Sequence, residues 1–172
     1  MIRSVNGKTP QVAASAFVSE AAYIVGDVVI GKGSSVWPGA VVRADTGRVV
    51  IGENTAVEDG CVIHSGMPPN EDVSIGNLVN IGHGAVVHAR SIGNNVLIGI
   101  NATVLHEAEI GDYCLIGAGC VVPSGMKVPD GSFVAGVPGK IKGKLTPEQL
   151  QWVEDSPRGY VELARLYKEA GL

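Results

Sequence analysis

An aliphatic residue recurs every six positions through most of this chain, and this period restricts the fold more than any other feature of the sequence. It matches neither the two-residue alternation of a hairpin sheet nor the period of about 3.6 residues of an amphipathic helix. A six-residue unit is typical of a parallel β-helix, in which three units close one triangular coil. The recurring positions are Val18, Ile24, Ile30, Val36, Val42, Ile51, Val57, Ile63, Ile75, Ile81, Val87, Ile92, Ile98, Val104, Ile110, Ile116, Val122, Val128 and Val134.

The period divides the chain into three segments. Residues 1–17 show no clear repeat and are interpreted as an N-terminal segment that leads into the β-helix. Residues 18–139 carry the repeat, and the eighteen anchors from Ile24 onward predict about six coils. Residues 140–172 lack the repeat and are interpreted as a helical tail. The predicted fold class is therefore all-β, a parallel β-helix with a C-terminal α-helix.

The tail carries helix-start signals. Thr146-Pro147-Glu148-Gln149 resembles a capping box with proline at the first helical position, and Ser156-Pro157 predicts a second start. After it, one apolar stripe is expected to pack back along the β-helix. The stripe consists of Tyr160, Leu163, Ala164 and Tyr167.

Glycine accounts for 24 of the 172 residues, about twice its usual share, which suggests many tight turns between short strands. The fourth position of the repeat often holds Gly or Asn, and a turn with positive φ is expected there. These residues are Gly33, Gly39, Gly60, Gly84, Asn95, Asn101 and Gly119.

The three cysteines all fall at the fifth position of the repeat, where alanine also occurs. A position shared by cysteine and alanine requires a small side chain, so Cys61, Cys114 and Cys120 are interpreted as buried thiols rather than metal ligands or disulfides. The formal net charge of −4 argues against a nucleic-acid partner. Neither a secretory signal nor a membrane span is recognisable, so we expect a cytoplasmic protein without a membrane partner.

Irregular gaps in the period decide which anchors stack. The Gly-, Pro- and Asn-rich stretch within residues 65–74 is interpreted as a loop extruded from one repeat. Every third anchor then lies on the same face of the coil. One face receives Val42, Ile63, Val87 and Val104, and another receives Val36, Val57, Ile81 and Ile98.

Polar residues fall into register with these columns. Arg43, His64 and His88 share the position after the anchor on the first face, and Asp59 and His83 share the position two after the anchor on the other. Adjacent strands lie about 4.8 Å apart, so His64 and His88 are predicted to stack and point outward. Two imidazoles placed this way can reach one metal ion at about 2.0–2.1 Å.

His83 is directed toward a different face, so it is expected to join the other two histidines only from a neighbouring subunit of a threefold assembly. Three histidines with an open fourth position are what a catalytic zinc ion needs to activate water. The alternative is that these are solvent-exposed surface histidines. Their arrangement in two columns, with Arg43, Asp45 and Asp59 beside them, favours the metal site. His106 lies off this set and is interpreted as a surface or interface residue.

Three segments resemble the gamma-class carbonic anhydrase family of left-handed β-helix trimers: VWPGAVVRAD (36–45), VEDGCVIH (57–64) and IGHGAVVH (81–88), followed by VLIG and AGVPGK. The resemblance implies a left-handed β-helix and a homotrimer. It implies Zn²⁺, with Fe²⁺ or Co²⁺ as alternatives, bound by His64, His83 and His88 between subunits. It further implies that Arg43 and Asp45 form interfacial ion pairs.

The activity implied is that of a lyase, the reversible hydration of carbon dioxide to bicarbonate by metal-bound hydroxide at the trimer interface. The resemblance makes Asp59 an active-site or interface acid. Glu58 stands where the best-studied members carry Gln, and it is a candidate with Asp59 to orient the water or receive its proton. The family's acidic loop after Asp45 is missing, and Glu71 is a candidate substitute for its proton shuttle. Slow, buffer-dependent turnover is therefore expected.

Two other functions remain open. Hexapeptide-repeat acyltransferases that use a coenzyme A thioester also trimerise and often end in a segment like AGVPGK, but acyl transfer needs only one histidine base. A catalytically weak binding or assembly homologue is the third hypothesis. Metal content distinguishes the first function from the second, and turnover distinguishes it from the third.

Overall fold

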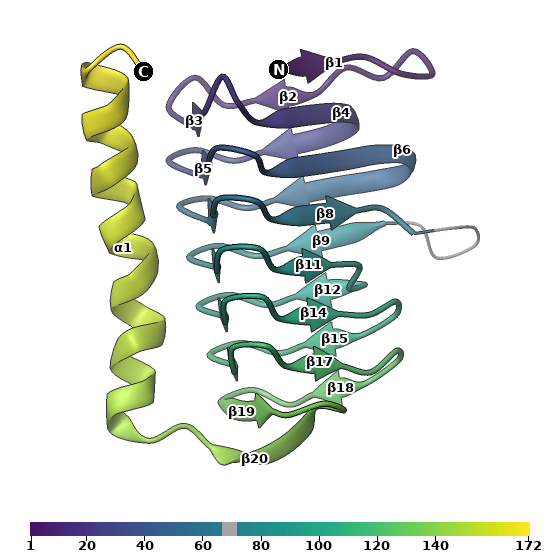
Figure 1. Ribbon diagram of the computed structural model, residues 1–172, viewed down its shortest axis with the longest axis vertical. Coiled ribbons are helices and arrows are strands. Elements are labelled where there is room, and N and C mark those ends of the chain that lie inside the picture. The colour runs from purple at the N-terminus through teal and green to yellow at the C-terminus, as the bar shows by residue number, and fades with distance from the viewer. Residues whose placement is uncertain (67–71) are drawn as a thin grey trace.

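The computed structural model describes residues 1–66 and 72–172, which form a left-handed parallel β-helix with one long helix beside it (Figure 1). The described coils make about seven turns, one more than expected. The additional coil comes from the N-terminal segment, because β1 (Ile2–Arg3) and β2 (Gln11–Val12) both pair in parallel with β4 (Tyr23–Ile30). The division of the chain into three segments stays an interpretation.

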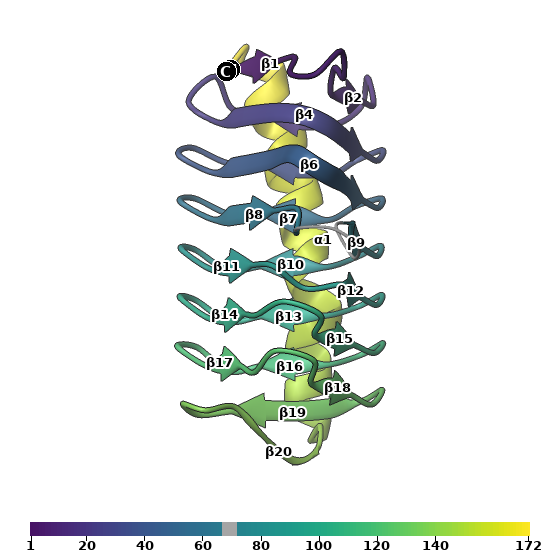
Figure 2. The ribbon, with the colours of Figure 1, turned by 90° about the vertical axis from the view of Figure 1, so that its right-hand side faces the viewer.

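Stacked strands build three faces, which Figure 2 shows as a ladder with the helix behind it. The first face follows the first half of β4 with β6 (Val41–Ile51), β8 (Val62–His64), β11 (Val86–Val87), β14 (Thr103–Val104) and β17 (Val121–Val122). The second face contains β9 (Val73–Ile75), β12 (Ser91–Ile92), β15 (Glu109–Ile110) and β18 (Lys127–Val128).

The third face is a separate eight-stranded sheet. Its strands are β3 (Phe17–Val18), β5 (Ser35–Val36), β7 (Ala56–Val57), β10 (Asn80–Ile81), β13 (Leu97–Ile98), β16 (Leu115–Ile116), β19 (Ser132–Ala135) and β20 (Lys140–Lys144). β20 pairs antiparallel with β19, whereas the other pairs of this sheet are parallel.

The strand register confirms the predicted columns. On the first face Val42 pairs with Ile63, Ile63 with Val87, and Val87 with Val104. On the third face the four anchors predicted to stack are paired in the same way. The long strand β6 passes from the first face to the second, since its beginning pairs with β8 and its end with β9.

The anchors form the core of the β-helix. From Ile24 to Val134 each has a relative exposure of 3% or less, while Val18 is half-buried. The three cysteines are buried and free, as their position in the repeat predicts. Burial raises the pKa of the Cys61 thiol to about 12, so this thiol stays protonated. The turn residues expected to need positive φ all have it, with values between 52° and 71°.

One helix, α1 (Pro147–Glu169), runs back along the third face beside β3, β5, β7, β10 and β13 (Figure 1). Thr146 and Gln149 form the predicted capping box. The predicted second start is wrong, because the helix continues through Pro157. A proline removes one hydrogen bond, but Val153 and Ala164 are buried on either side of it and keep the helix packed on the sheet. Among the described residues, no helix is long and apolar enough to cross a membrane.

Candidate functional site

Arg43, His64 and His88 project from successive coils of the first face. Arg43 pairs in register with His64, and His88 follows Val87, whose partner in β8 is Ile63. The imidazole centroids of His64 and His88 lie 4.7 Å apart with perpendicular planes, and His64 Nδ1 is 3.0 Å from His88 Nε2. The predicted stacking of these histidines is confirmed, whereas their role as ligands stays a prediction.

Asp45 contacts the His64 ring through the other ring nitrogen. Its Oδ1 is 3.2 Å from His64 Nε2, and its Oδ2 forms an ion pair with Arg43. Burial, the largest influence, raises the pKa of Asp45, but hydrogen bonds from Arg43 and His64 outweigh it and lower the pKa below its usual value. An ionised Asp45 accepts a hydrogen bond from the Nε2–H of His64, so Nδ1 carries the lone pair, which faces His88 Nε2 at 3.0 Å and Arg43 Nη2 at 3.3 Å. This ion pair lies within one chain, and the pairing across subunits stays a prediction.

The His88 ring is neutral at pH 7. Burial, followed by electrostatic repulsion from His106, His64 and Arg43, lowers the pKa of His88 to about 4. A metal ion requires a neutral imidazole, so this environment suits a ligand. The Nδ1 atom of His88 is buried and has no hydrogen-bond partner among the described residues.

His106 lies against the histidine column and not off it. Its ring centroid is 4.3 Å from that of His88, with the planes tilted by 40°. The residue is exposed, as expected for the surface. In this coil the position directly after the anchor Val104 is Leu105, so the six-residue period does not align His106 with His64 and His88. His106 reaches His88 from the next position, two residues after the anchor.

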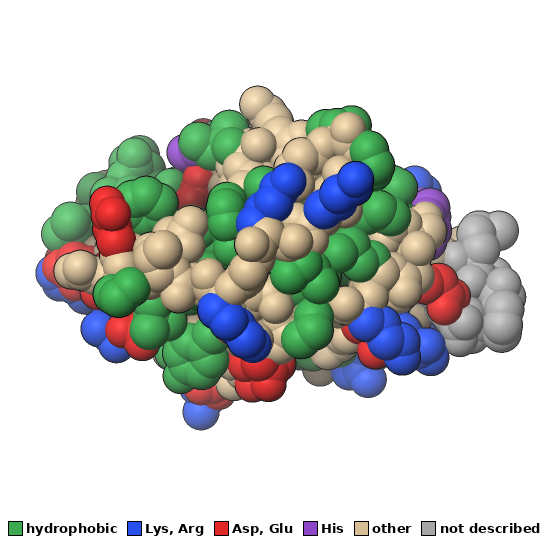
Figure 3. Space-filling view, turned by 90° about the horizontal axis from the view of Figure 1, so that it is seen from below, with side chains coloured by type: hydrophobic (Ala, Val, Ile, Leu, Met, Phe, Trp, Pro, Cys, Tyr) green, Lys and Arg blue, Asp and Glu red, His purple; other side chains and the backbone are tan. Residues whose placement is uncertain are grey.

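The third predicted ligand, His83, projects from a different corner of the coil. Asp59 and His83 each lie two residues after stacked anchors of β7 and β10, and Gly60 and Gly84, with φ of 68° and 70°, complete the turns. His83 Nδ1 is 3.1 Å from Asp59 Oδ2, and its Nε2 is 3.0 Å from Glu58 Oε2. Figure 3 shows histidine side chains at two separate edges of the molecule.

Glu58 is a buried carboxylate at this corner, with a relative exposure of 4%. Its Oε1 accepts a hydrogen bond of 2.8 Å from Asn80 Nδ2, and its Oε2 accepts one of 2.9 Å from the backbone N–H of His83. These donors compensate for the loss of water around the carboxylate. The two predicted acids, Glu58 and Asp59, thus both contact His83.

Tyr160 of α1 reaches the same carboxylate, a role that the sequence did not indicate. Burial, then the charge of Glu58 and a hydrogen bond to it, raises the pKa of Tyr160 well above its usual range. The ring also packs edge-on against Trp37, with centroids 5.5 Å apart. Tyr160 therefore both packs α1 against the β-helix and contacts the polar cluster around Glu58.

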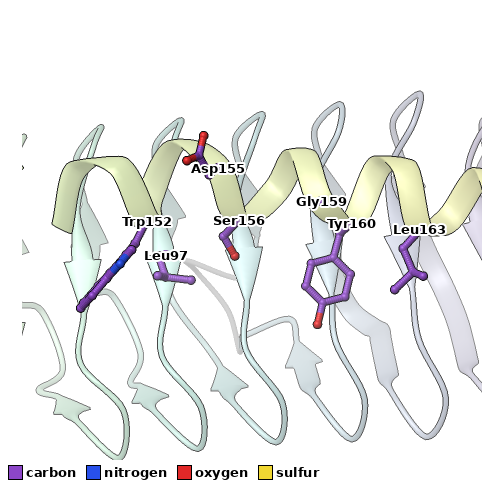
Figure 4. Close-up of a pocket in the computed structure, with 7 residues that line it drawn as sticks. All are labelled: Leu97, Trp152, Asp155, Ser156, Gly159, Tyr160 and Leu163. Carbon is purple, nitrogen blue, oxygen red and sulfur yellow. The ribbon is translucent and has the colours of Figure 1, made fainter. Parts of the chain in front are cut away.

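An apolar groove runs beside α1 and ends at this cluster. One part of it has a volume of about 560 Å³ and is lined by Glu58 and by residues of β13 and β16. Figure 4 shows the adjoining part, where Trp152, Ser156 and Tyr160 point from α1 toward the sheet next to Leu97. The Glu58 carboxylate therefore lies at the boundary between a polar corner and an apolar groove.

The described side chains of one chain do not complete a metal site by themselves. Within the part of the chain that the structure describes, no group of three or more His, Cys, Asp or Glu side chains could hold a metal ion. Two nitrogens at 2.0–2.1 Å from a tetrahedral ion lie about 3.3 Å apart, close to the 3.0 Å between His64 Nδ1 and His88 Nε2. One chain thus offers two donors at one corner and His83 at another, which fits a site shared between copies. Glu71 lies outside the described residues.

The coils and their histidine columns define a hexapeptide-repeat β-helix protein with imidazole donors at two corners. A family model described as bacterial transferase hexapeptide (six repeats) matches residues 91–124. A carbonic anhydrase of Geobacillus kaustophilus (strain HTA426) is 41% identical over 168 residues, which cover 98% of this chain and 91% of that protein. Gamma carbonic anhydrase 2, mitochondrial, of Arabidopsis thaliana is 31% identical over 173 residues, which cover 96% of this chain and 61% of that protein.

The chain therefore belongs to the gamma-class carbonic anhydrase family. Among solved structures, a hexapeptide transferase family protein from Anaplasma phagocytophilum is similar with a TM-score of 0.91 and 34% identity, over 96% of this chain and 97% of that one. The curated relatives support a carbonic anhydrase-like function. The likeness to a hexapeptide transferase family structure supports the fold and fits the alternative of acyl transfer.

Proposed function

We propose that this protein hydrates carbon dioxide reversibly to bicarbonate, with a divalent metal ion held by His64, His83 and His88 between the subunits of a homotrimer. The observation that carries the proposal is the approach of His64 Nδ1 to within 3.0 Å of His88 Nε2, with His83 on another corner of the coil. Zinc is the first choice of metal, while Fe²⁺ and Co²⁺ also accept imidazole ligands.

A zinc ion in such a site supplies Lewis-acid chemistry that lowers the pKa of water from 15.7 to about 7. The chain's own residues prepare the ligands for it. Asp45 accepts a hydrogen bond from the Nε2–H of His64 and so fixes its tautomer and its ring orientation. Burial keeps His88 neutral, so no proton has to leave this ring before it binds.

His83 is prepared differently, because both of its ring nitrogens contact carboxylates in the single chain. Binding a metal requires that one of these contacts is released, and the other then orients the ring. The released carboxylate, Glu58 or Asp59, becomes available to orient the reacting water or to accept its proton. From there the proton passes to buffer, and this step accounts for the slow, buffer-dependent turnover that we expect.

The test is metal analysis and carbon dioxide hydration measured on the same purified samples of wild type, His88→Ala and His83→Ala. We expect both variants to lose metal and activity, and wild type to turn over faster as the buffer concentration rises. Equal metal content in wild type and His88→Ala would contradict the site. Full metal in wild type without hydration at any buffer concentration would contradict the activity and leave the fold unaffected.

The second candidate is acyl transfer from a coenzyme A thioester to a hydroxyl or amine, with one histidine as general base. The match to the transferase hexapeptide family and the likeness to a hexapeptide transferase family structure favour it. Release of free thiol from acetyl-coenzyme A in the presence of acceptors, unchanged after metal chelation, would support this function over hydration. A trimer that binds metal but shows neither reaction would support a binding or assembly role.

We place the protein in the cytoplasm as part of this proposal. Its three cysteines are free, which is the usual state in a reducing compartment.

A further inference from the structure

The fourth histidine of the chain, His106, lies at the end of the column that contains two of the proposed ligands. We propose that His106 is a positioning residue, whose ring holds His88 in the orientation that directs Nε2 toward His64. This inference rests on the proposed metal site and adds to it a residue that binds neither the metal nor the substrate.

Within the described part of the chain, His88 lacks the hydrogen bond that usually fixes the ring of a metal-binding histidine. A histidine that binds a metal almost always donates its second ring N–H to a carboxylate, a carbonyl or water, and this bond fixes the ring. His64 has such a partner in Asp45, at 3.2 Å. The second nitrogen of His88, Nδ1, is buried and has no partner among the described residues. The orientation of the His88 ring therefore depends on packing.

Two neighbouring imidazole rings, those of His64 and His106, supply this packing. The His64 ring stands perpendicular to His88 with centroids 4.7 Å apart, and the His106 ring lies at 4.3 Å with a tilt of 40°. His88 is thus held between side chains from the coils before and after its own. Without the His106 ring, this contact is lost and rotation about the outer torsion of His88 would move Nε2 away from His64.

The backbone that carries the His106 ring is held in place. The carbonyl of His106 accepts a hydrogen bond of 2.9 Å from the N–H of Gly125 in the next coil, and the following residue, Glu107, has a φ of 61° that closes a tight turn. In the next coil the equivalent position, two after the anchor Val122, is Ser124, which is also exposed. Ser124→Ala is therefore a matched control for the loss of an exposed side chain at this turn.

The experiment compares full-length wild type, His106→Ala, His106→Phe and Ser124→Ala. After treatment with a chelator, each protein is titrated with Co²⁺, and binding is followed by visible absorption. We expect His106→Ala to weaken Co²⁺ binding about tenfold, in the range typical for loss of a residue that orients a ligand. His106→Phe keeps a ring against His88 and should bind like wild type, as should Ser124→Ala.

Two results would overturn the proposal. If His106→Ala binds Co²⁺ like wild type, His106 does not position His88. If His106→Phe is as weak as His106→Ala, a nitrogen atom of His106 is required and the ring contact is not the cause. Circular dichroism and the mass in solution check that all four proteins have the same fold and assembly.

A measurement on the metal-free proteins separates this inference from the proposed function. The nuclear Overhauser effect between the ring C–H protons of His64 and His88 reports the orientation of the His88 ring, whereas the chemical shifts change in both variants because the ring current at position 106 changes. This effect should be kept in wild type and His106→Phe and weakened in His106→Ala. If it is equally strong in wild type and His106→Ala, the inference fails even if wild type binds Co²⁺. If wild type binds no Co²⁺ while the effect weakens in His106→Ala as expected, the metal site fails and the positioning contact stands.

Discussion

Replacement of Glu58 tests how the buried carboxylate supports the corner that carries His83. In Glu58→Ala the side-chain amide of Asn80, the backbone N–H of His83 and the hydroxyl of Tyr160 lose their acceptor. A buried donor without a partner costs about 1–3 kcal/mol, and less where water can reach it, as at the partly buried His83 N–H and Tyr160 hydroxyl, so the free energy of unfolding should fall by about 2–6 kcal/mol. With a denaturant slope of about 2 kcal/mol/M, the midpoint of urea unfolding should fall by about 1–3 M.

Glu58→Gln is the matched control, because it keeps the shape and restores the residue found in the best-studied family members. If the amide nitrogen of the new glutamine replaces Glu58 Oε1, it faces the Asn80 Nδ2 donor. A 180° flip of the Asn80 side-chain amide would present Oδ1, which is buried without a partner among the described residues, as the acceptor. The expected cost is then about 1 kcal/mol, mainly for the lost charge. Urea midpoints are compared at one protomer concentration. A loss below about 1 kcal/mol in Glu58→Ala, or equal losses in both variants, would refute the reasoning.

Three further predictions concern other parts of the molecule. Arg43→Ala should weaken the trimer and metal binding together, because Asp45 then keeps its charge without its ion-pair partner. Sedimentation measures the assembly and metal analysis measures the metal content. If neither the assembly nor the metal content changes, the interfacial role is contradicted. Because the pKa of the Tyr160 hydroxyl is raised in the folded state, the protonated hydroxyl contributes its full stabilisation below pH about 10, the pKa of tyrosine in the unfolded chain. This contribution is lost as the pH rises from there through the pKa of the folded state. The difference in urea midpoint between wild type and Tyr160→Phe should therefore shrink above pH about 10, and a constant difference would argue against this linkage. Burial raises the pKa of Cys61 to about 12, so in native protein at pH about 8 this thiol should resist alkylation until denaturant is added.

The fold was predictable because the residue that each strand buries recurs every six positions and pairs with its equivalents in the neighbouring coils. Anchors such as Ile63 and Ile81 are fully buried and pair with the anchors of the coils before and after them. The N-terminal coil was missed because β1 and β2 are only two residues long and mostly exposed, so they carry no apolar period. The uninterrupted helix at Pro157 was missed because packing against the sheet outweighs one lost hydrogen bond.

The candidate site was predictable where it depends on strand register alone. His64 and His88 meet because successive coils repeat one position, and the same rule places Asp59 beside His83. The contact of His106 with His88 depends on the direction of a side chain in a turn, which the period does not define. The contact between Tyr160 and Glu58 depends on the position of α1 along the third face. The six-residue period ends before α1 begins, so it does not predict which helix residue lies beside which coil.

The breaks in the period themselves point to the site. Only three steps between the anchors from Ile24 to Val134 differ from six residues, and they follow Val42, Ile63 and Val87. All three lie at the corner where the first face turns into the second, in successive coils. The residues directly after these three anchors are Arg43, His64 and His88, the members of the candidate site on this face. One coil further along the step returns to six residues, and there the position after the anchor is the apolar Leu105. Departures from a regular pattern tend to mark functional positions, and here they coincide with the histidine column.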